Sequence, residues 1–191
     1  MSGSTGPRIV TERLVLRPFT DVDRPPFAEL NAHPLVVESL GESPSRAESD
    51  ALADRFSEEM AREGWGLWAV EVAGGQPFVG MVGLHRVNAA LPCAPAVEVG
   101  WRFHPDHWGH GYATEAAAAS LRFGFDEAQL EEIVAFTTTL NTRSQAVMER
   151  IGMVRDPSGD FDHPRLPDGS PLRRHVLYRV TASQAGPTVA P

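Results

Sequence analysis

The strongest constraint on the fold is a strand, a loop and a helix that follow one another between residues 96 and 126. In AVEVGWRF, residues 96–103, large apolar side chains alternate with small or charged ones, and this period of two predicts a strand. Residues 104–111 are rich in His, Pro and Gly, and residues 112–126 are strong helix formers despite Gly124. A strand that turns through glycines into a helix points to a domain of mixed α/β class.

Further elements can be read on both sides of this junction. The capping-box pairs Thr20/Asp23 and Ser45/Glu48 predict two helix starts, and Asn141 opens a further short helix. Alternating or β-branched residues predict six more strands, at 9–17, 65–72, 77–86, 133–139, 153–161 and 173–180. The sequence therefore predicts an α/β (α+β) domain with a mixed sheet of about seven strands and helices on both faces.

Length and cysteine content limit the class of protein. The 191 residues suffice for one domain, predicted at 9–182, with flexible ends at 1–8 and 183–191. The single cysteine, Cys93, excludes an internal disulfide framework and a cysteine-based zinc site. No stretch approaches the roughly 20 apolar residues that span a bilayer, and the N-terminus lacks the apolar segment of a secretory signal. We expect a cytoplasmic protein that does not bind membranes.

The net charge of −8 narrows the choice of partner. General nucleic-acid binding needs a basic face that neutralises phosphates, so nucleic acid is not expected as a partner. An acidic protein suits a cationic partner such as an amine. The charge can equally serve only to keep the protein in solution. No sequence feature indicates an oligomeric state, and a homodimer is kept as one alternative.

The loop HWGHGYAT, residues 107–114, has the features of an anion site. A helix N-terminus supplies several N–H donors and a favourable dipole for a pyrophosphate. Gly109 and Gly111 remove β-carbons that would block close approach of the backbone, and Ala113 is small for the same reason. An ordinary tight turn before a helix is the alternative. A Walker A loop is excluded because no Gly-Lys-Ser/Thr follows. The segment also fits the dinucleotide-binding motif G-x-G-x-x-G poorly, because that motif requires glycine at position 114, which is Thr.

Two longer segments carry a resemblance to a known family. The run EVGWRFHPDHWGHGYATEA, followed about thirty residues later by LNTRSQAVMERIGM, resembles the GNAT N-acetyltransferases. The nearest branch is similar to the ribosomal-protein alanine acetyltransferases (Rim-type), whose first strand the opening TERLVLRPF also resembles. The similarity covers about residues 9–181. It implies a single GNAT-like domain, with a mostly antiparallel sheet whose splayed central strands hold CoA.

The resemblance implies acetyl-CoA as co-substrate and a set of residues that bind it. The pyrophosphate loop falls on Trp108–Ala113, with Trp108 in place of the usual Gln or Arg. The preceding strand pairs its backbone with the pantetheine arm, Asn141 contacts the cofactor and Ser144 lies near the sulfur. The alternative for these last two is that Asn141 caps its helix and Ser144 is its capping partner. The expected cofactor-binding residues are Trp101, Arg102, Phe103, Trp108, Gly109, His110, Gly111, Tyr112, Ala113, Thr114, Asn141 and Ser144.

The implied reaction is attack of a neutral amine on the acetyl thioester. A protonated amine must first lose a proton, which a carboxylate can accept through water. Glu98 is the candidate base, and an ion pair with Arg102 on the same strand face is the alternative. His163 is the second choice as base, and a turn residue is its alternative. A strand N–H near Phe103 would hold the oxyanion, and Ser144 would protonate or only position the leaving thiolate.

No metal is expected. His104, His107 and His110 recur every three residues, but Pro105 and Gly109 break any helix that would align them. The acceptor amine, either a small molecule or a protein N-terminal α-amine, cannot be read from the sequence. An antibiotic-modifying acetyltransferase differs only in acceptor. A CoA-binding regulatory module without turnover is the competing class.

Overall fold

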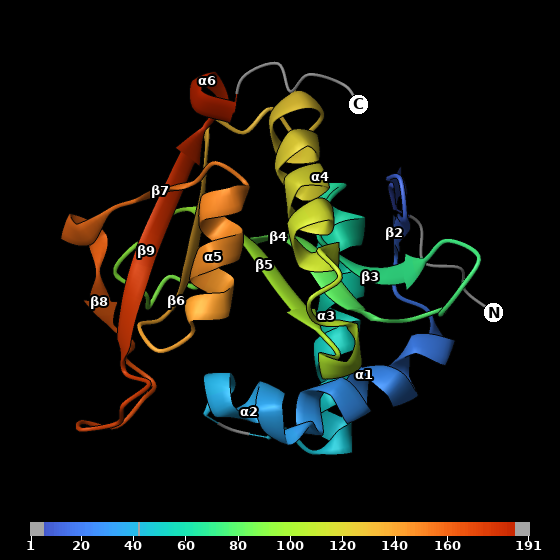
Figure 1. Ribbon diagram of the computed structural model, residues 1–191, viewed down its shortest axis with the longest axis horizontal. Coiled ribbons are helices and arrows are strands. Elements are labelled where there is room, and N and C mark those ends of the chain that lie inside the picture. Colours follow the sequence, from blue (N-terminus) through green and yellow to red (C-terminus); the bar gives the residue numbers. More distant parts are fainter. Residues whose placement is uncertain (1–5, 42, 186–191) are drawn as a thin grey trace.

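The computed structural model describes residues 6–41 and 43–185, and these form one α/β domain (Figure 1). The N-terminal half contains the elements β1 (Ile9–Val10), β2 (Leu14–Arg17), α1 (Arg24–Ala32), α2 (Pro34–Leu40), α3 (Arg46–Glu63), β3 (Leu67–Val72) and β4 (Gly80–Arg86). The C-terminal half contains β5 (Val97–Phe103), α4 (Tyr112–Asp126), β6 (Glu132–Thr138), α5 (Thr142–Arg150), β7 (Val154–Arg155), β8 (Phe161–Asp162), β9 (Arg174–Thr181) and α6 (Ala182–Ala185).

All described strands belong to a single sheet. Its order is β1-β2-β3-β4-β5-β6-β9-β7, and β8 pairs separately with β9. The pair β5–β6 is parallel and the remaining pairs are antiparallel, which confirms the predicted mixed, mostly antiparallel class.

The strand count is nine rather than about seven, because two predicted strands are broken. In the segment 9–17 the chain turns, with the Thr11 N–H donating to the Leu14 carbonyl at 2.9 Å. The segment 153–161 is interrupted by the 3-10 helix Pro157–Gly159, since proline has no N–H to donate to a ladder.

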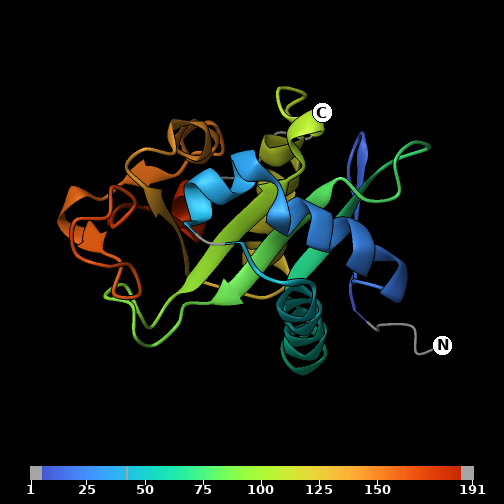
Figure 2. The same ribbon diagram turned by 90° about the horizontal axis from the view of Figure 1, so that it is seen from below.

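Helices cover both faces of the sheet, as the sequence predicts. Figure 1 shows α4 in front of β3, β4 and β5 and α3 behind them. Figure 2, seen from below, shows α1 and α2 crossing in front of the same strands. The side chains Trp68, Val70, Val82 and Leu84 face α4, whereas Leu67, Ala69 and Met81 face α1 and α3. Successive strand residues point to opposite faces, so each of β3 and β4 contributes to both cores.

The predicted helix starts are confirmed. Ser45 and Glu48 form a reciprocal capping box at α3, with the Ser45 N–H donating to Glu48 Oε2 at 2.8 Å. Thr20 and Asp23 form the second box, and Asp23 is also buried against Arg17. Gly124 has a packing role within α4, because a β-carbon there would lie 2.6 Å from Cδ1 of Ile133. The glycine thus lets the helix approach β6 closely.

The ends of the chain are described only in part. Residues 1–5 and 186–191 of the predicted flexible ends lie outside the described residues. The indole of Trp68 donates to the Pro7 carbonyl at 2.8 Å, and residues 182–185 form α6. Among the residues that the structure describes, no helix is both long enough and apolar enough to cross a bilayer.

Candidate active site

The central strands β5 and β6 separate towards their carboxyl ends. Val134 on β6 is paired with Glu98 on β5, and within the described residues this is the single register pair between the two strands. On its other edge β5 is paired with β4 along its whole length, from Val97 to Phe103. The β6 side of β5 therefore loses its strand partner after Glu98.

The alternation of backbone hydrogen bonds decides which residues of β5 face this open edge. The His104 N–H donates to the Val79 carbonyl at 2.9 Å, so the backbone of His104, and by alternation that of Arg102, faces β4. The backbone groups of Trp101 and Phe103 consequently face the side of β6. Of the three strand residues expected to bind cofactor, Trp101 and Phe103 have main-chain groups at the open edge, and Arg102 does not.

The loop between β5 and α4 bends at its two glycines. Gly109 has φ of +79° and Gly111 has φ of +81°, a left-handed conformation that favours glycine. Gly111 is the N-cap of α4, and it offers no side chain to the first turn of the helix. A helix start without a side-chain cap leaves its first N–H groups without partners unless a ligand supplies them.

Six consecutive backbone donors lie along this loop. The N–H groups of residues 109–114 have no hydrogen-bond acceptor among the described residues, and the first intrahelical bond runs from Glu115 to the Gly111 carbonyl at 3.0 Å. Backbone donors in such a turn form a concave anion site, and the helix dipole adds to its positive potential. The arrangement fits a phosphate group held by main-chain nitrogens.

Arg13, in the turn before β2, fixes this loop from outside. Its Nη1 donates to the His110 carbonyl at 2.9 Å, and its Nε donates to Glu115 Oε2 at 2.7 Å. The guanidinium also lies 5.2 Å from the ring centroid of Tyr112. Sequence reasoning missed Arg13, although it belongs to the TERLVLRPF segment, because the contact joins residues about a hundred positions apart.

Trp108 connects the loop to both flanking elements. Its indole N–H donates to the Phe103 carbonyl at 2.8 Å, at the end of β5. The guanidinium of Arg143, from the first turn of α5, lies 4.6 Å from its ring centroid. Arg143, which sequence reasoning also missed, thereby becomes a cationic side chain at the mouth of the anion site.

Asn141 and Ser144 lie at the start of α5, as predicted. Asn141 caps the helix, since its Oδ1 accepts from the Ser144 N–H at 3.1 Å. The capping alternative is thus correct, and it leaves the Asn141 amide nitrogen and the Ser144 hydroxyl without hydrogen-bond partners among the described residues. A cofactor role for these two groups stays a prediction.

Glu98 points to the face of the sheet opposite α4. It is 9% exposed, and its Oε2 lies 3.1 Å from Nε2 of His85 on β4. The alternative ion pair with Arg102 is not formed, because Arg102 instead donates to Oδ1 of Asn31 on α1. A β-carbon at Gly100 would lie 3.5 Å from Nε2 of His85 and 3.9 Å from the other carboxylate oxygen, Oε1, so both side chains lie close to the glycine.

His85 is the partner that sequence reasoning missed. Its Nδ1 lies 3.3 Å from the Arg86 carbonyl, which can only accept, so Nδ1 carries a proton. Burial by itself would lower the pKa of His85, but the Glu98 carboxylate outweighs burial and raises the pKa above its ordinary value. With acceptors at both ring nitrogens, the imidazolium form is favoured.

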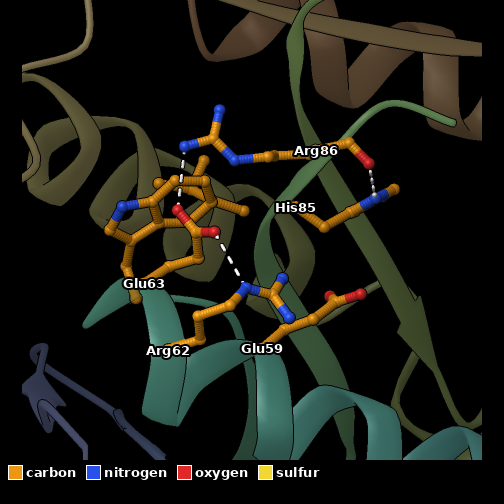
Figure 3. Close-up of a pocket in the computed structure, with 7 residues that line it drawn as sticks. Glu59, Arg62, Glu63, His85 and Arg86 are labelled. Atoms are coloured by element: carbon orange, nitrogen blue, oxygen red, sulfur yellow. Dashed lines mark hydrogen bonds and ion pairs between the residues drawn. The ribbon is translucent and has the colours of Figure 1, made fainter. Parts of the chain in front are cut away.

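The far side of His85 borders a small pocket between α3 and β4 (Figure 3). The pocket has a volume of about 20 Å³, enough for roughly one water molecule. Charged side chains of α3, among them Glu59 and Glu63, line it together with Trp65. His85 therefore lies between the Glu98 carboxylate and a polar cavity at the protein surface.

His163, the second candidate base, lies in another cluster. It is 8% exposed, and its ring centroid lies 5.0 Å from that of His175 on β9. Burial, with a contribution from His175, lowers the pKa of His163, so it is neutral at pH 7. Its Nδ1 accepts from the Arg165 N–H at 3.3 Å, which is the hydrogen bond of a turn residue.

The histidines of the loop region do not form a metal site. His104 lies near His33 and His107, with ring centroids 5.2 and 6.3 Å apart. Over residues 6–41 and 43–185, no group of three or more His, Cys, Asp or Glu side chains is arranged to hold a metal ion.

Comparison with known proteins agrees with this architecture. A family model described as Acetyltransferase (GNAT) domain matches residues 13–154. The FsC-acetyl coenzyme A-N(2)-transacetylase of Aspergillus fumigatus is 31% identical over 154 residues, which cover 77% of this chain and 65% of that protein. The structure of an acetyltransferase (GNAT family) from Bacillus anthracis is similar with a TM-score of 0.77 and 27% identity, covering 93% and 99% of the two chains.

A further solved structure is similar in fold and contains ligands. Spermidine N-acetyltransferase from Vibrio cholerae, in complex with CoA and spermine, has a TM-score of 0.73 at 19% identity, over 92% of this chain and 99% of that one. The fold and the named relatives together define the class of this chain, which is that of acyl-CoA-dependent N-acetyltransferases. The chain belongs to the GNAT family of acetyltransferases. The predicted family is thus confirmed, and the Rim-type branch stays a prediction.

Proposed function

We propose that the protein transfers an acetyl group from acetyl-CoA to a primary amine, by direct attack of the amine within a ternary complex. The observation that carries this proposal is the row of six N–H groups at residues 109–114, which have no acceptor in the part of the chain that the structure describes. A net acidic protein can hold a polyanion in this way, because main-chain dipoles rather than cationic side chains bind the phosphates. Arg143, beside Trp108, would add one positive charge at the mouth of the site.

The rest of the co-substrate would follow the open edge of β5. The pantetheine amides would hydrogen-bond to the backbone groups of Trp101 and to the Phe103 N–H, in place of the missing β6 partner, since the Phe103 carbonyl already accepts from Trp108. The thioester would then lie near the start of α5, where the Asn141 amide nitrogen and the Ser144 hydroxyl have no protein partner among the described residues. Arg102 is left out of this part of the proposal, since its backbone bonds to β4.

The chemical step needs a neutral amine and a place for its proton. The amine nitrogen forms a bond to the thioester carbon, the carbon–sulfur bond breaks, and the amine proton passes through water to Glu98. The Phe103 N–H would stabilise the charge that develops on the thioester oxygen. Ser144 would position or protonate the leaving thiolate. His163 is the alternative base, being buried and neutral at pH 7.

The acceptor class is a primary amine of a small molecule or a protein N-terminus. The name of the Aspergillus relative describes transfer to an N(2) nitrogen, and the Vibrio neighbour was solved with the polyamine spermine. A CoA-binding regulatory module of the same fold is the alternative. Release of free thiol from acetyl-CoA over a panel of amines separates the two, since the module would bind the co-substrate without releasing CoA.

The decisive test is a charge placed at the centre of the anion site. Gly111→Asp puts a carboxylate against the phosphates, whereas Gly111→Asn has nearly the same size and the same left-handed backbone requirement. We expect the Asp variant to lose measurable acetyl-CoA binding in calorimetry, and the Asn variant to bind more tightly than the Asp variant by at least tenfold. Equal affinity in both variants, or wild-type affinity in Gly111→Asp, would place the phosphates elsewhere.

A further inference from the structure

Arg102 lies in a partly enclosed position and has no charge partner among the described residues. The other arginines without an ion pair in the described part of the chain are all exposed, namely Arg55, Arg122, Arg143, Arg150 and Arg165. Arg102 is only partly accessible, and none of its nitrogens lies within ion-pair distance of a carboxylate in residues 6–41 or 43–185. Withdrawing a cation from water without a counter-charge is costly, so the position calls for an explanation.

The side chain of Arg102 is held in place by a short buried chain of polar groups. One terminal nitrogen donates to Oδ1 of Asn31, and Nδ2 of Asn31 donates to the Ser49 hydroxyl at 2.7 Å. Asn31 and Ser49 are both fully buried, on α1 and α3 respectively. These groups orient the guanidinium from two helices, and being neutral they supply no charge opposite to it.

The remaining donors of Arg102 stay available to a ligand. Over residues 6–41 and 43–185, its Nε and second terminal nitrogen have no hydrogen-bond acceptor. The fully enclosed polar atoms without a partner in that part of the chain are Oγ1 of Thr138 and Nε of Arg155, so neither nitrogen of Arg102 is among them. These donors therefore remain accessible. Burial also lowers the pKa of Arg102 to about 10, as expected for a cation that lacks its anion.

Arg102 lies on the side of β5 where the acceptor amine would meet Glu98, and not on the side of the co-substrate loop. Its side chain is on the α1 side of β5, on the same face as Glu98, whereas Val99 and Phe103 point to the α4 side. Gly100 separates the two charged residues along the strand, and Nε2 of His85 lies 3.5 Å from where a β-carbon of this glycine would be. With a strand rise of about 3.3 Å per residue, the Cα atoms of Glu98 and Arg102 lie ~13 Å apart.

We infer that Arg102 binds an anionic group of the acceptor, so that this enzyme acetylates amines that also carry a carboxylate several bonds away. The amine lies at Glu98, the chain of the acceptor crosses Gly100, and the carboxylate accepts from the two free donors of Arg102. This inference rests on the proposed function, because it takes Glu98 as the group beside the reacting amine. A bidentate guanidinium–carboxylate contact suits the planar pair of donors that Asn31 leaves free.

The test is a series of ω-amino carboxylates of increasing length, from glycine to 8-aminooctanoate, each compared with the primary amide of the same acid. For wild type we expect kcat/KM to favour the carboxylate over its amide by about tenfold or more at an intermediate length. In Arg102→Gln that ratio falls to near one. Arg55→Gln, an exposed arginine of α3, serves as the matched control and keeps the wild-type ratio.

The possible outcomes separate this inference from the proposed function. If no amine releases CoA, the acetyl-transfer function itself fails. If amines react but carboxylates and amides react equally well at every length, the function stands and the role of Arg102 is wrong. The wild-type series decides this even where Arg102→Gln does not fold, and a preference that survives in folded Arg102→Gln also overturns the inference.

Discussion

Nε2 of His85 lies 3.1 Å from Oε2 of Glu98, and this pair joins β4 to β5 on the face of the sheet away from α4. The contact uses one carboxylate oxygen, and Oε1 has no hydrogen-bond partner among the described residues. A base that serves an incoming amine needs one oxygen held and the other accessible. The pair therefore gives Glu98 a fixed orientation, and it places a second proton-binding group directly behind the proposed base.

Replacing Glu98 by Gln should lower kcat while acetyl-CoA affinity stays the same. The amide keeps the size of the side chain and removes its ability to accept the amine proton. We expect a fall of about a hundredfold or more in kcat, the usual scale for losing a general base. Steady-state kinetics with calorimetry for acetyl-CoA separates the two quantities. Full activity of Glu98→Gln at neutral pH, together with a loss of activity in His163→Gln, would show that His163 is the base and Glu98 is not.

The protonation of His85 should depend on Glu98. The pKa of His85 is raised above its ordinary value of 6.5 by the carboxylate, against the lowering effect of burial. In Glu98→Gln the main opposition to burial is removed, and only the Arg86 carbonyl and Glu59 still favour the charged form, so the pKa of His85 should fall. Histidine ring shifts followed by NMR over pH report this directly. His163 is the internal control, because its lowered pKa is caused by burial and by His175, and it should not move.

The same pair should make stability depend on pH in a definite direction. A histidine whose pKa is higher in the folded than in the unfolded state stabilises the fold fully below its unfolded pKa, and this contribution is lost as the pH rises through the folded pKa. His85 has a raised pKa. The difference in unfolding free energy between wild type and His85→Gln should therefore be larger at about pH 6 than at pH 9. A difference that grows towards alkaline pH would contradict this account of the pair.

Local patterns predicted the parts of this site that depend on neighbours in the chain. The strand 96–103, the loop and α4 follow from alternation, glycines and helix propensity, and Asn141 follows from capping chemistry. His85 and Arg13 were missed because their partners lie 13 and 102 residues away, and strand register with loop placement decides those contacts. Arg102 was assigned to the cofactor from its position in a motif. The pairing of β5 with β4 places its backbone towards β4, and the contact with Asn31 places its side chain on the α1 side; its role towards the cofactor stays a prediction.

Arg13 should affect co-substrate binding without touching it. Its guanidinium fixes the His110 carbonyl and Glu115, on either side of the loop glycine Gly111. Without this contact the donors of residues 109–114 converge less well, so Arg13→Gln should weaken acetyl-CoA affinity by about tenfold. Arg8→Gln is the matched control, since Arg8 is exposed and makes only a 3.8 Å ion pair with Glu71. Equal acetyl-CoA affinities of the two variants in calorimetry would show that Arg13 does not position the loop.

The buried ion pair at the start of α1 should be a main source of stability remote from the chemistry. Asp23 is 1% exposed and accepts from two nitrogens of Arg17, at 2.7 and 2.8 Å, and from the Thr20 N–H at 2.8 Å. Asp23→Asn keeps the shape but leaves the arginine without this charge, and breaking one side of a buried pair costs about 3–5 kcal/mol. Because Glu71 still contacts Arg17 at 2.8 Å, we expect the lower end of that range.

Urea unfolding compares Asp23→Asn with a nearby exposed control. Asp21 also pairs with an arginine, Arg24 at 3.1 Å, but its side chain is 92% exposed, and surface pairs contribute about 1 kcal/mol or less. Asp21→Asn should therefore leave the unfolding midpoint almost unchanged, while Asp23→Asn lowers the midpoint at the same denaturant slope. Similar losses in the two variants would mean that burial does not strengthen this contact.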